Sequence, residues 1–206
     1  MFGVCDAIMK RSMREVEPIF DLRDKRLLGY EVLYRGVEDR ERFFEECTER
    51  EDLEIFLGHV EEIRRAKRDG ELYFVNVFGS TILAYWDVIE RECRDLKDCL
   101  VLEISEKRKA SSRELKGILE RLGFGVCVDD FGSGWNSLEL ILELGPQFVK
   151  LDVKHFHEVL PWVVKLVRAV RARPIIEKVE TGKDLLLVRR NDVCLIQGKI
   201  LESVRV

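Results

Sequence analysis

The sequence predicts a compact (β/α)₈ barrel, and three observations lead to that fold class. Short runs rich in Val, Ile, Leu and aromatic residues alternate with amphipathic segments of helical length, which indicates a parallel sheet with helices packed outside it. Almost every run ends in a polar residue, and in such a barrel the strand ends meet around one mouth, where the active site lies. The chain has 206 residues, whereas this fold typically needs about 250, so we expect shortened helices and connections.

Eight runs are predicted to be strands, because each is apolar or β-branched and bounded by charged or turn residues. In chain order they are Val16–Leu22, Leu27–Leu33, Leu72–Phe78, Leu100–Ile104, Gly125–Asp129, Phe148–Leu151, Pro174–Ile176 and Val193–Ile196.

Helices are expected between these runs. Glu41–Asp69 is long enough to hold two helices. Ser112–Leu122 begins beside a candidate cap, Ser111 or Ser112, with Glu114 close behind. Leu160–Arg173 carries apolar residues at the i, i+3, i+4, i+7 spacing. Because no low-complexity stretch or Gly/Ser linker interrupts the pattern, we predict a single domain over residues 1–206.

Composition narrows the classes of function. The 35 basic residues nearly balance the 39 acidic ones, for a net charge of −4, which argues against a protein that binds nucleic acid polymers. No run approaches the length of a membrane-spanning helix, and the first residues lack the apolar segment of a secretory signal. We therefore expect a cytoplasmic protein that does not engage a membrane. Many charges with only three Asn and two Gln are typical of heat-adapted proteins.

The polar residues at the ends of the predicted strands suit metal chemistry. A charged group buried at the end of an apolar strand is costly unless it is paired or binds a metal, so a ring of them predicts a polyvalent cation site. Carboxylate and amide oxygens favour Mg²⁺, Mn²⁺ or Ca²⁺. The residues are Glu31, Asn76, Glu103, Asp129 with Asp130, Lys150 with Asp152, Glu177 and Gln197. Solvated loop acids are the alternative interpretation.

Asp129 and Asp130 indicate the chemistry. Adjacent side chains diverge, so the two aspartates can serve two metals, or one metal and its surroundings. Two divalent metals with a carboxylate between them recur in phosphodiester hydrolysis. Lys150, at a neighbouring strand end, could orient the water or neutralise charge on the phosphate.

Eight segments, in order and at compatible spacing, match one family. They are Glu17-Pro18-Ile19, Gly29-Tyr30-Glu31-Val32-Leu33-Tyr34-Arg35, Val75-Asn76-Val77, Leu102-Glu103-Ile104-Ser105-Glu106, Val128-Asp129-Asp130-Phe131-Gly132-Ser133-Gly134-Trp135, Val149-Lys150-Leu151-Asp152, Glu177-Lys178-Val179-Glu180-Thr181 and Gln197-Gly198. From about Glu17 to Gln197 the chain resembles the EAL domain, the phosphodiesterase that opens the bacterial second messenger cyclic di-GMP.

The resemblance implies a metal set and a catalytic set. The first metal would be held by Glu31, Asn76, Glu103 and Asp129. Asp129 and Asp130 would help to hold a second metal. Lys150 would bind or activate the attacking water. Glu177 would support the metal and water network, and Gln197 would orient water or ligand.

The resemblance also implies residues around the substrate. Arg35 would contact a substrate phosphate, and Glu17, Asp152 and Gln197 are the other expected substrate-binding residues. Glu106 would brace the loop after Asp130, which also shapes the dimer contact in this family, and Glu180 is expected to support the same region.

The implied fold is a modified TIM barrel with one antiparallel strand. The implied reaction cleaves one phosphodiester of cyclic di-GMP to give linear pGpG, using Mg²⁺ or Mn²⁺ in two sites, with Ca²⁺ as an inhibitor. A homodimer is the expected assembly.

Several positions depart from the family pattern. Glu17 replaces the usual Gln, Gly36 replaces an expected aromatic residue, and Ile176 and Lys178 replace small residues beside Glu177. The expected metal set is intact while the expected nucleotide-binding set is altered. Two alternatives therefore stay open beside the enzyme: a non-catalytic module that binds cyclic di-GMP or a protein partner, and a hydrolase of a smaller phosphodiester.

Overall fold

The computed structural model describes residues 14–105 and 110–203. Its eight strands form one closed barrel in the order β1-β2-β3-β4-β5-β6-β7-β8. The strands are β1 Arg14–Asp21, β2 Arg26–Tyr34, β3 Leu72–Val77, β4 Leu100–Ile104, β5 Gly125–Val128, β6 Phe148–Asp152, β7 Arg173–Glu177 and β8 Leu195–Gln197. The predicted barrel is confirmed, and every predicted strand overlaps an observed one.

The strand β1 is the antiparallel member of the barrel. It pairs antiparallel with β2 on one side and with β8 on the other, whereas all other neighbouring strands pair in parallel. A hairpin of a few residues suffices to join β1 to β2, because antiparallel neighbours need no crossover helix. The expected modified barrel with one antiparallel strand is therefore confirmed.

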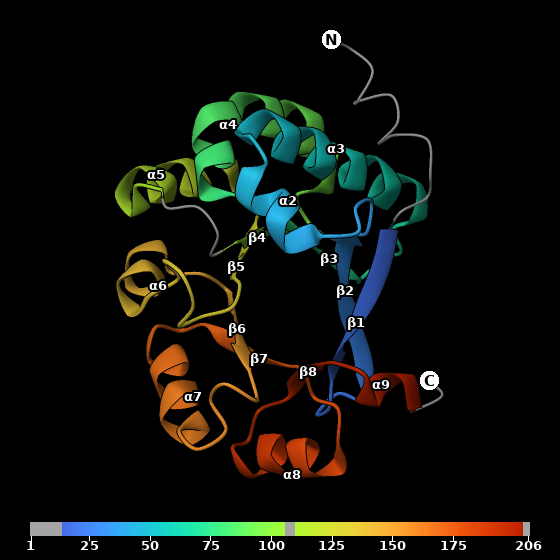
Figure 1. Cartoon of the computed structure of the whole chain (residues 1–206), viewed down its shortest axis with the longest axis vertical. Coiled ribbons are helices and arrows are strands. Elements are labelled where there is room, and N and C mark those ends of the chain that lie inside the picture. The colour runs from blue at the N-terminus through green and yellow to red at the C-terminus, as the bar shows by residue number, and fades with distance from the viewer. Residues whose placement is uncertain (1–13, 106–109, 204–206) are drawn as a thin grey trace.

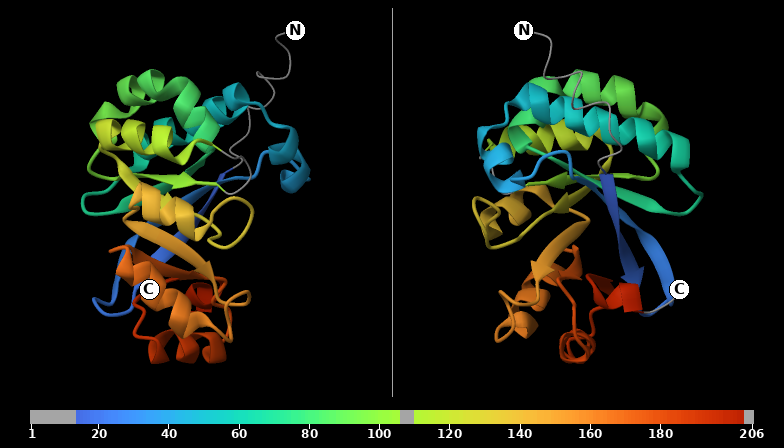
Figure 2. Two further views of the ribbon diagram at one scale, coloured as in Figure 1. Left: turned by 90° about the vertical axis from the view of Figure 1, so that its left-hand side faces the viewer. Right: turned by 45° about the vertical axis from the view of Figure 1, so that its right-hand side comes forward.

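The helices form two groups outside the barrel (Figures 1 and 2). One group lies towards one end of the long axis, and the other extends from the middle of that axis to the opposite end. The first comprises α2 Arg40–Glu46, α3 Glu49–Ala66, α4 Gly79–Cys93 and α5 Ser112–Leu122. The second comprises α6 Leu138–Leu144, α7 Leu160–Ala169 and α8 Gly182–Arg190. A 3₁₀ turn at Arg94–Leu96 follows α4, and the short α9 Ile200–Ser203 follows β8.

Helix starts follow local capping chemistry. The Ser111 hydroxyl accepts from the backbone N–H of Glu114, so Ser111 is the cap of α5. Thr48 and Thr181 begin α3 and α8 with reciprocal capping boxes. Such caps satisfy backbone N–H groups that a helix start leaves unpaired, and they fix where each helix leaves the barrel.

The predicted helix over Leu160–Arg173 is too long. α7 ends at Ala169, Arg171 adopts a φ of 65°, and Arg173 already begins β7. The apolar spacing continues through Val170 because that side chain still packs against the core next to the helix. The predicted pair of helices within Glu41–Asp69 is confirmed by α2 and α3.

One layer of side chains fills the barrel interior away from the mouth. Each strand contributes one member to a cluster of buried side chains, namely Ile19, Leu28, Phe74, Val101, Cys127, Phe148, Ile175 and Leu195. The alternate residues of the same strands point outwards and pack under the helices, as Val75 and Leu102 do in one outer cluster and Val149 and Ile176 do in the other. This alternation is the period of two expected for a strand.

Candidate active site

A polar layer lies one step towards the mouth from the apolar interior layer. In six strands the polar residue stands two positions beyond the apolar one, which keeps both on the inner face. In β1 the order is reversed because that strand runs the other way, and in β2 a register shift adds one residue. The layer comprises Glu17, Glu31, Asn76, Glu103, Asp129, Lys150, Glu177 and Gln197.

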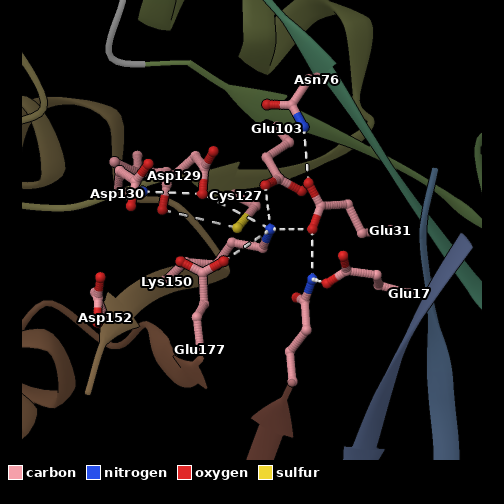
Figure 3. A network of polar contacts seen from close by, with 12 residues as sticks. Glu17, Glu31, Asn76, Glu103, Cys127, Asp129, Asp130, Lys150, Asp152 and Glu177 are labelled. Atoms are coloured by element: carbon pink, nitrogen blue, oxygen red, sulfur yellow. Dashed lines mark hydrogen bonds and ion pairs between the residues drawn. The ribbon is translucent and has the colours of Figure 1, made fainter. Parts of the chain in front are cut away.

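Lys150 occupies the centre of the polar layer (Figure 3). Its side chain is 1% exposed, and its Nζ lies 2.8 Å from Glu31 Oε2, 3.4 Å from Glu177 Oε1 and 3.7 Å from Asp129 Oδ1. It also forms an ion pair with Glu103. One ammonium group therefore faces four carboxylates in the barrel interior, where solvent screens their charges least.

Glu31 is the second point of convergence. Its Oε1 accepts from Asn76 Nδ2 at 2.9 Å, and its Oε2 accepts from Lys150 Nζ and from Gln197 Nε2, the latter at 2.5 Å. Burial raises the pKa of Glu31, but the charge of Lys150 and these hydrogen bonds outweigh it and hold the pKa below its ordinary value. Of the four carboxylates that face Lys150, Glu31 is therefore the one whose ionised form is favoured.

Three other carboxylates have raised pKa values. Burial, together with the charge of Glu31, raises the pKa of Glu103 well above its ordinary value. Burial and the charges of neighbouring carboxylates do the same for Glu177 against the opposing effect of Lys150, and they raise the pKa of Asp129 to about 6. The layer thus holds more carboxyl groups than one lysine can keep ionised, and a bound cation would favour their ionised forms.

The donor atoms suit a hard divalent cation. Carboxylate oxygens of Asp129, Asp130 and Glu177 all lie within 4.8 Å of one another. Glu177 Oε2 and Glu103 Oε2 are buried and accept no hydrogen bond from the described residues, while Glu103 Oε1 faces Lys150. Oxygen ligands of this kind are those that Mg²⁺, Mn²⁺ and Ca²⁺ prefer, so the residues present fit the metal expected from the sequence.

Asn136 fixes the loop that carries the two aspartates. Its side chain is fully buried, and its Nδ2 donates to the backbone oxygens of Asp129 at 2.5 Å and Ile104 at 3.1 Å. This residue is not among those predicted from the sequence. The rarity of Asn in the sequence is a signal that could have identified it, because two of the three Asn in the chain, Asn76 and Asn136, lie at this mouth.

Glu17 contacts two residues that were expected to bind substrate. Its Oε2 accepts from Gln197 Nε2 at 3.0 Å, and its Oε1 lies 3.6 Å from an Arg35 nitrogen. Arg35 also donates to Glu15 at 2.5 Å. The cationic and amide donors expected at a substrate phosphate are therefore held by carboxylates of β1.

A cavity of about 340 Å³ opens beside the polar layer. It reaches from Glu31, Asn76 and Asp129 to aromatic side chains near α2 and α3, and its lining includes Tyr34, Phe44, His59 and Phe78. A side chain on Gly36 would lie within 2.1 Å of the Tyr34 hydroxyl, so the Tyr34 ring fills the space next to the position where the family pattern has an aromatic residue. The volume falls in the range of small-molecule sites.

The remaining predicted residues lie around the rim or outside it. Asp152 ends β6 and accepts from Lys178 Nζ at 2.5 Å, while Figure 3 shows it apart from the Lys150 contacts. Its burial raises the pKa of Asp152, but that hydrogen bond and those from the backbone of Lys154 and His155 lower it below the ordinary value. Glu180 is exposed and lies 3.7 Å from Lys154, and Glu106 lies outside the described residues.

The fold and the site define a modified (β/α)₈ barrel whose mouth is lined by buried carboxylates around one lysine. Residues 15–203 match the family model of the EAL domain, and the chain belongs to that family. Within the described part of the chain, no helix is both long and apolar enough to cross a membrane.

Curated relatives share this domain at low identity. The chain is 26% identical over 206 residues to the cyclic di-GMP phosphodiesterase TpdA of Vibrio parahaemolyticus, an alignment that covers 89% of this chain and 35% of that protein. It is 30% identical over 118 residues to PdeG of Escherichia coli, a probable cyclic di-GMP phosphodiesterase, covering 51% of this chain and 23% of that one. The chain thus spans about a third or less of the length of these relatives.

Solved structures agree in fold. An EAL domain protein from Listeria monocytogenes superposes with a TM-score of 0.80 at 18% identity, covering 96% of this chain and 90% of that one. The Bacillus subtilis YkuI protein, solved in complex with substrate cyclic di-GMP and calcium, gives a TM-score of 0.73 at 23% identity, covering 91% and 53%. At these identities the likeness establishes the barrel.

Proposed function

We propose that this chain is a metal-dependent phosphodiesterase that hydrolyses cyclic di-GMP to linear pGpG. The observation that carries the proposal is the buried layer of four carboxyl groups around the single cation of Lys150. The names of the curated relatives support the choice of substrate.

Carboxylate and amide oxygens of the layer, together with Asp130 beside it, would hold the metals in two groups. Glu31, Asn76, Glu103 and Asp129 would hold the first ion, and Asp129, Asp130 and Glu177 the second. Mg²⁺ or Mn²⁺ bound there would supply an activated water and would stabilise charge on the leaving oxygen. We propose that Ca²⁺ binds the same residues and inhibits.

Protein groups would position the reactants. Water adds to one phosphorus, the bond from that phosphorus to the ribose 3′ oxygen breaks, and the proton released by water ends on that oxygen. Lys150 Nζ would hold the water by a hydrogen bond, and Glu177 would support the metal and water network, since its Oε2 is buried and accepts no hydrogen bond from the described residues. Gln197 and Arg35 would bind the phosphate, with Asp152 and Glu17 at the rim.

The aromatic cavity is the proposed place for one guanine. Base stacking on an aromatic face is sequence-tolerant and contributes about 1–3 kcal/mol. Phe44 lines the cavity without belonging to the polar layer. Phe44→Ala should therefore raise KM for cyclic di-GMP several-fold and leave kcat within about twofold.

The experiment is incubation of the purified chain with cyclic di-GMP and Mn²⁺ or Mg²⁺, with separation of the products by chromatography. We expect pGpG from the wild type. We expect almost none from Glu31→Ala or Lys150→Ala, because each removes a centre of the network. Full activity in either variant would remove the role proposed for that residue.

A sensor that binds cyclic di-GMP without turnover is the second candidate. The observation that favours a non-catalytic role is Glu17, whose carboxylate contacts both Arg35 and Gln197, the two groups proposed to position the phosphate for hydrolysis. Tight nucleotide binding with Ca²⁺ and no product with Mg²⁺ would establish the sensor. Turnover of a smaller phosphodiester, but not of cyclic di-GMP, would assign a different substrate to the same site.

We further propose a single cytoplasmic domain over residues 1–206 that forms a homodimer and comes from a heat-adapted source. Light scattering on the purified chain tests the dimer. A melting midpoint above the mesophile range of about 45–65 °C tests the heat adaptation.

A further inference from the structure

Lys178 stands in an unusual backbone position next to the proposed metal ligands. It directly follows Glu177 at the end of β7 and adopts a φ of 55°. This left-handed conformation is uncommon for residues other than glycine and is worth about 1 kcal/mol of strain or more. The strained backbone places a long cationic side chain at the rim of the carboxylate layer.

The Lys178 ammonium is tethered at that rim. Its Nζ donates to Asp152 Oδ2 at 2.5 Å and lies 4.0 Å from Asp130 Oδ1. Asp152 is itself fixed, because its Oδ1 accepts from the backbone N–H groups of Lys154 at 2.7 Å and His155 at 3.3 Å. The hydrogen bond to Asp152 therefore holds the Lys178 ammonium close to Asp130.

Asp130 belongs to the group that would hold the second metal. Its carboxylate oxygens lie within 4.8 Å of those of Asp129 and Glu177. Independently, Glu177 Oε2 is buried and accepts no hydrogen bond from the described residues, as expected for an atom that faces a cation. The first-metal residues, by contrast, surround Lys150, and within the described part of the chain the ion pairs of Lys178 are with Asp130 and Asp152.

We infer that Lys178 is a built-in cation that weakens binding of the second divalent ion while leaving the first site unaffected. An ion held by Asp130, whose Oδ1 lies 4.0 Å from Lys178 Nζ, would bring a like charge close to that ammonium, and like charges at short range repel even near a protein surface. The side chain of Lys178 is 54% exposed, so salt should screen this repulsion. The inference rests on the proposed function, because it concerns the second of the two metal sites proposed there.

The experiment is calorimetric titration of the purified chain with Mn²⁺ in the absence of nucleotide. Lys178→Gln keeps the side-chain stem and the backbone strain but removes the charge, whereas Lys178→Arg keeps the charge. Lys165→Gln is the matched control. Lys165 is exposed on α7, and its substitution changes the net charge of the protein by the same amount. A thermal melt in the same buffer verifies that each variant is folded.

We expect two sites of unequal affinity in the wild type. Lys178→Gln should tighten the weaker site about tenfold at low salt and leave the tighter one within about twofold. Lys178→Arg and Lys165→Gln should match the wild type. High salt should reduce the difference in Mn²⁺ affinity at the weaker site between Lys178→Gln and the wild type, because salt screens the repulsion.

Three results would overturn the inference. An unchanged weaker site in Lys178→Gln would show that the charge has no effect, and would leave the proposed phosphodiesterase standing. Equal tightening in Lys178→Arg would assign the effect to something other than charge. If neither the wild type nor Lys178→Gln binds Mn²⁺, both this inference and the metal site of the proposed function fail.

Discussion

Lys150 and Glu31 are separated by 119 positions in the sequence, yet the Lys150 Nζ donates to Glu31 Oε2 at 2.8 Å in the barrel interior. β2 and β6 carry them to opposite walls of the barrel, and the pair joins those walls across the mouth. Because Asn76 and Gln197 also donate to Glu31, the contact links four strands. We regard this pair as the centre of the site.

Removing the central charge should destabilise the metal-free protein. Lys150→Met keeps most of the stem but leaves buried carboxylates without their cation, and such a loss costs about 3–5 kcal/mol. Denaturant unfolding with a chelator present measures the free energy of unfolding. Lys165→Met, at an exposed position on α7, should change it by no more than about 0.5 kcal/mol. Equal stability of the Lys150 variant and the wild type would contradict the description of Lys150 as the charge that the layer depends on.

The effect of metal on stability should grow as the pH rises. The pKa of Asp129 is about 6 in the folded chain against 3.8 ordinarily. The folded state therefore binds more protons than the unfolded state between these values, and metal-free stability falls as pH rises through that window. Metal binding needs the deprotonated form. The increase in melting temperature on adding Mn²⁺ should thus be larger at about pH 7.5 than at about pH 5.

Asp129→Asn provides the control for this pH effect. It removes the titrating group, so the Mn²⁺-induced increase should be smaller and should vary less with pH. An increase of the same size at both pH values in the wild type would argue that the metal does not bind at this layer.

Glu17 should lower the affinity for an anionic substrate. Its carboxylate contacts Gln197 and Arg35, and Glu17→Gln removes the negative charge while keeping the shape. Calorimetry with Ca²⁺ present should show cyclic di-GMP binding tighter by about fivefold to tenfold, since like charges near a surface repel by this order. Glu15→Gln, at a residue that contacts Arg35, should give a smaller change. Weaker binding in Glu17→Gln would instead indicate that Glu17 accepts hydrogen bonds from the nucleotide.

Two glycines should respond oppositely to alanine. A Cβ on Gly29 would lie 1.9 Å from the backbone oxygen of Leu72, where β2 pairs with β3, whereas a Cβ on Gly117 in α5 would meet nothing within 4 Å. Gly29→Ala should therefore lower the free energy of unfolding by at least about 2 kcal/mol. Gly117→Ala should raise it by about 0.5–1 kcal/mol, because alanine favours the helix. A stable Gly29→Ala protein would mean that β2 and β3 pack less closely than the structure has them.

The barrel could be predicted from the sequence because each strand has a recognisable local pattern. Each carries an apolar run with a polar residue at or near its end, and parallel strands bring those ends together. Glu31 is the exception, since β2 continues beyond it to Tyr34 in order to pair with β1. The sequence alone shows neither that extension nor the register shift in β1 and β2.

Side-chain contacts between residues far apart in the chain could not be predicted from the sequence. Nothing local shows that Lys150 reaches Glu31, that Glu17 contacts Gln197, or that Lys178 reaches Asp152, because these distances depend on barrel closure. The end of α7 could not be predicted either. The apolar residues before β7 continue the helical spacing, although the backbone has already turned at Arg171. Asn136 was missed because its role is visible only once its buried hydrogen bonds are seen.

The central claim is that the buried carboxylate layer hydrolyses cyclic di-GMP with the help of divalent cations. Its most direct test is incubation with cyclic di-GMP and Mn²⁺ in heavy-oxygen water, followed by mass spectrometry of the product. We predict linear pGpG with one heavy oxygen in its terminal phosphate, formed by the wild type, lost on chelation and absent in Glu103→Gln. Unchanged cyclic di-GMP in the wild-type reaction, or the same product from Glu103→Gln, would contradict the claim.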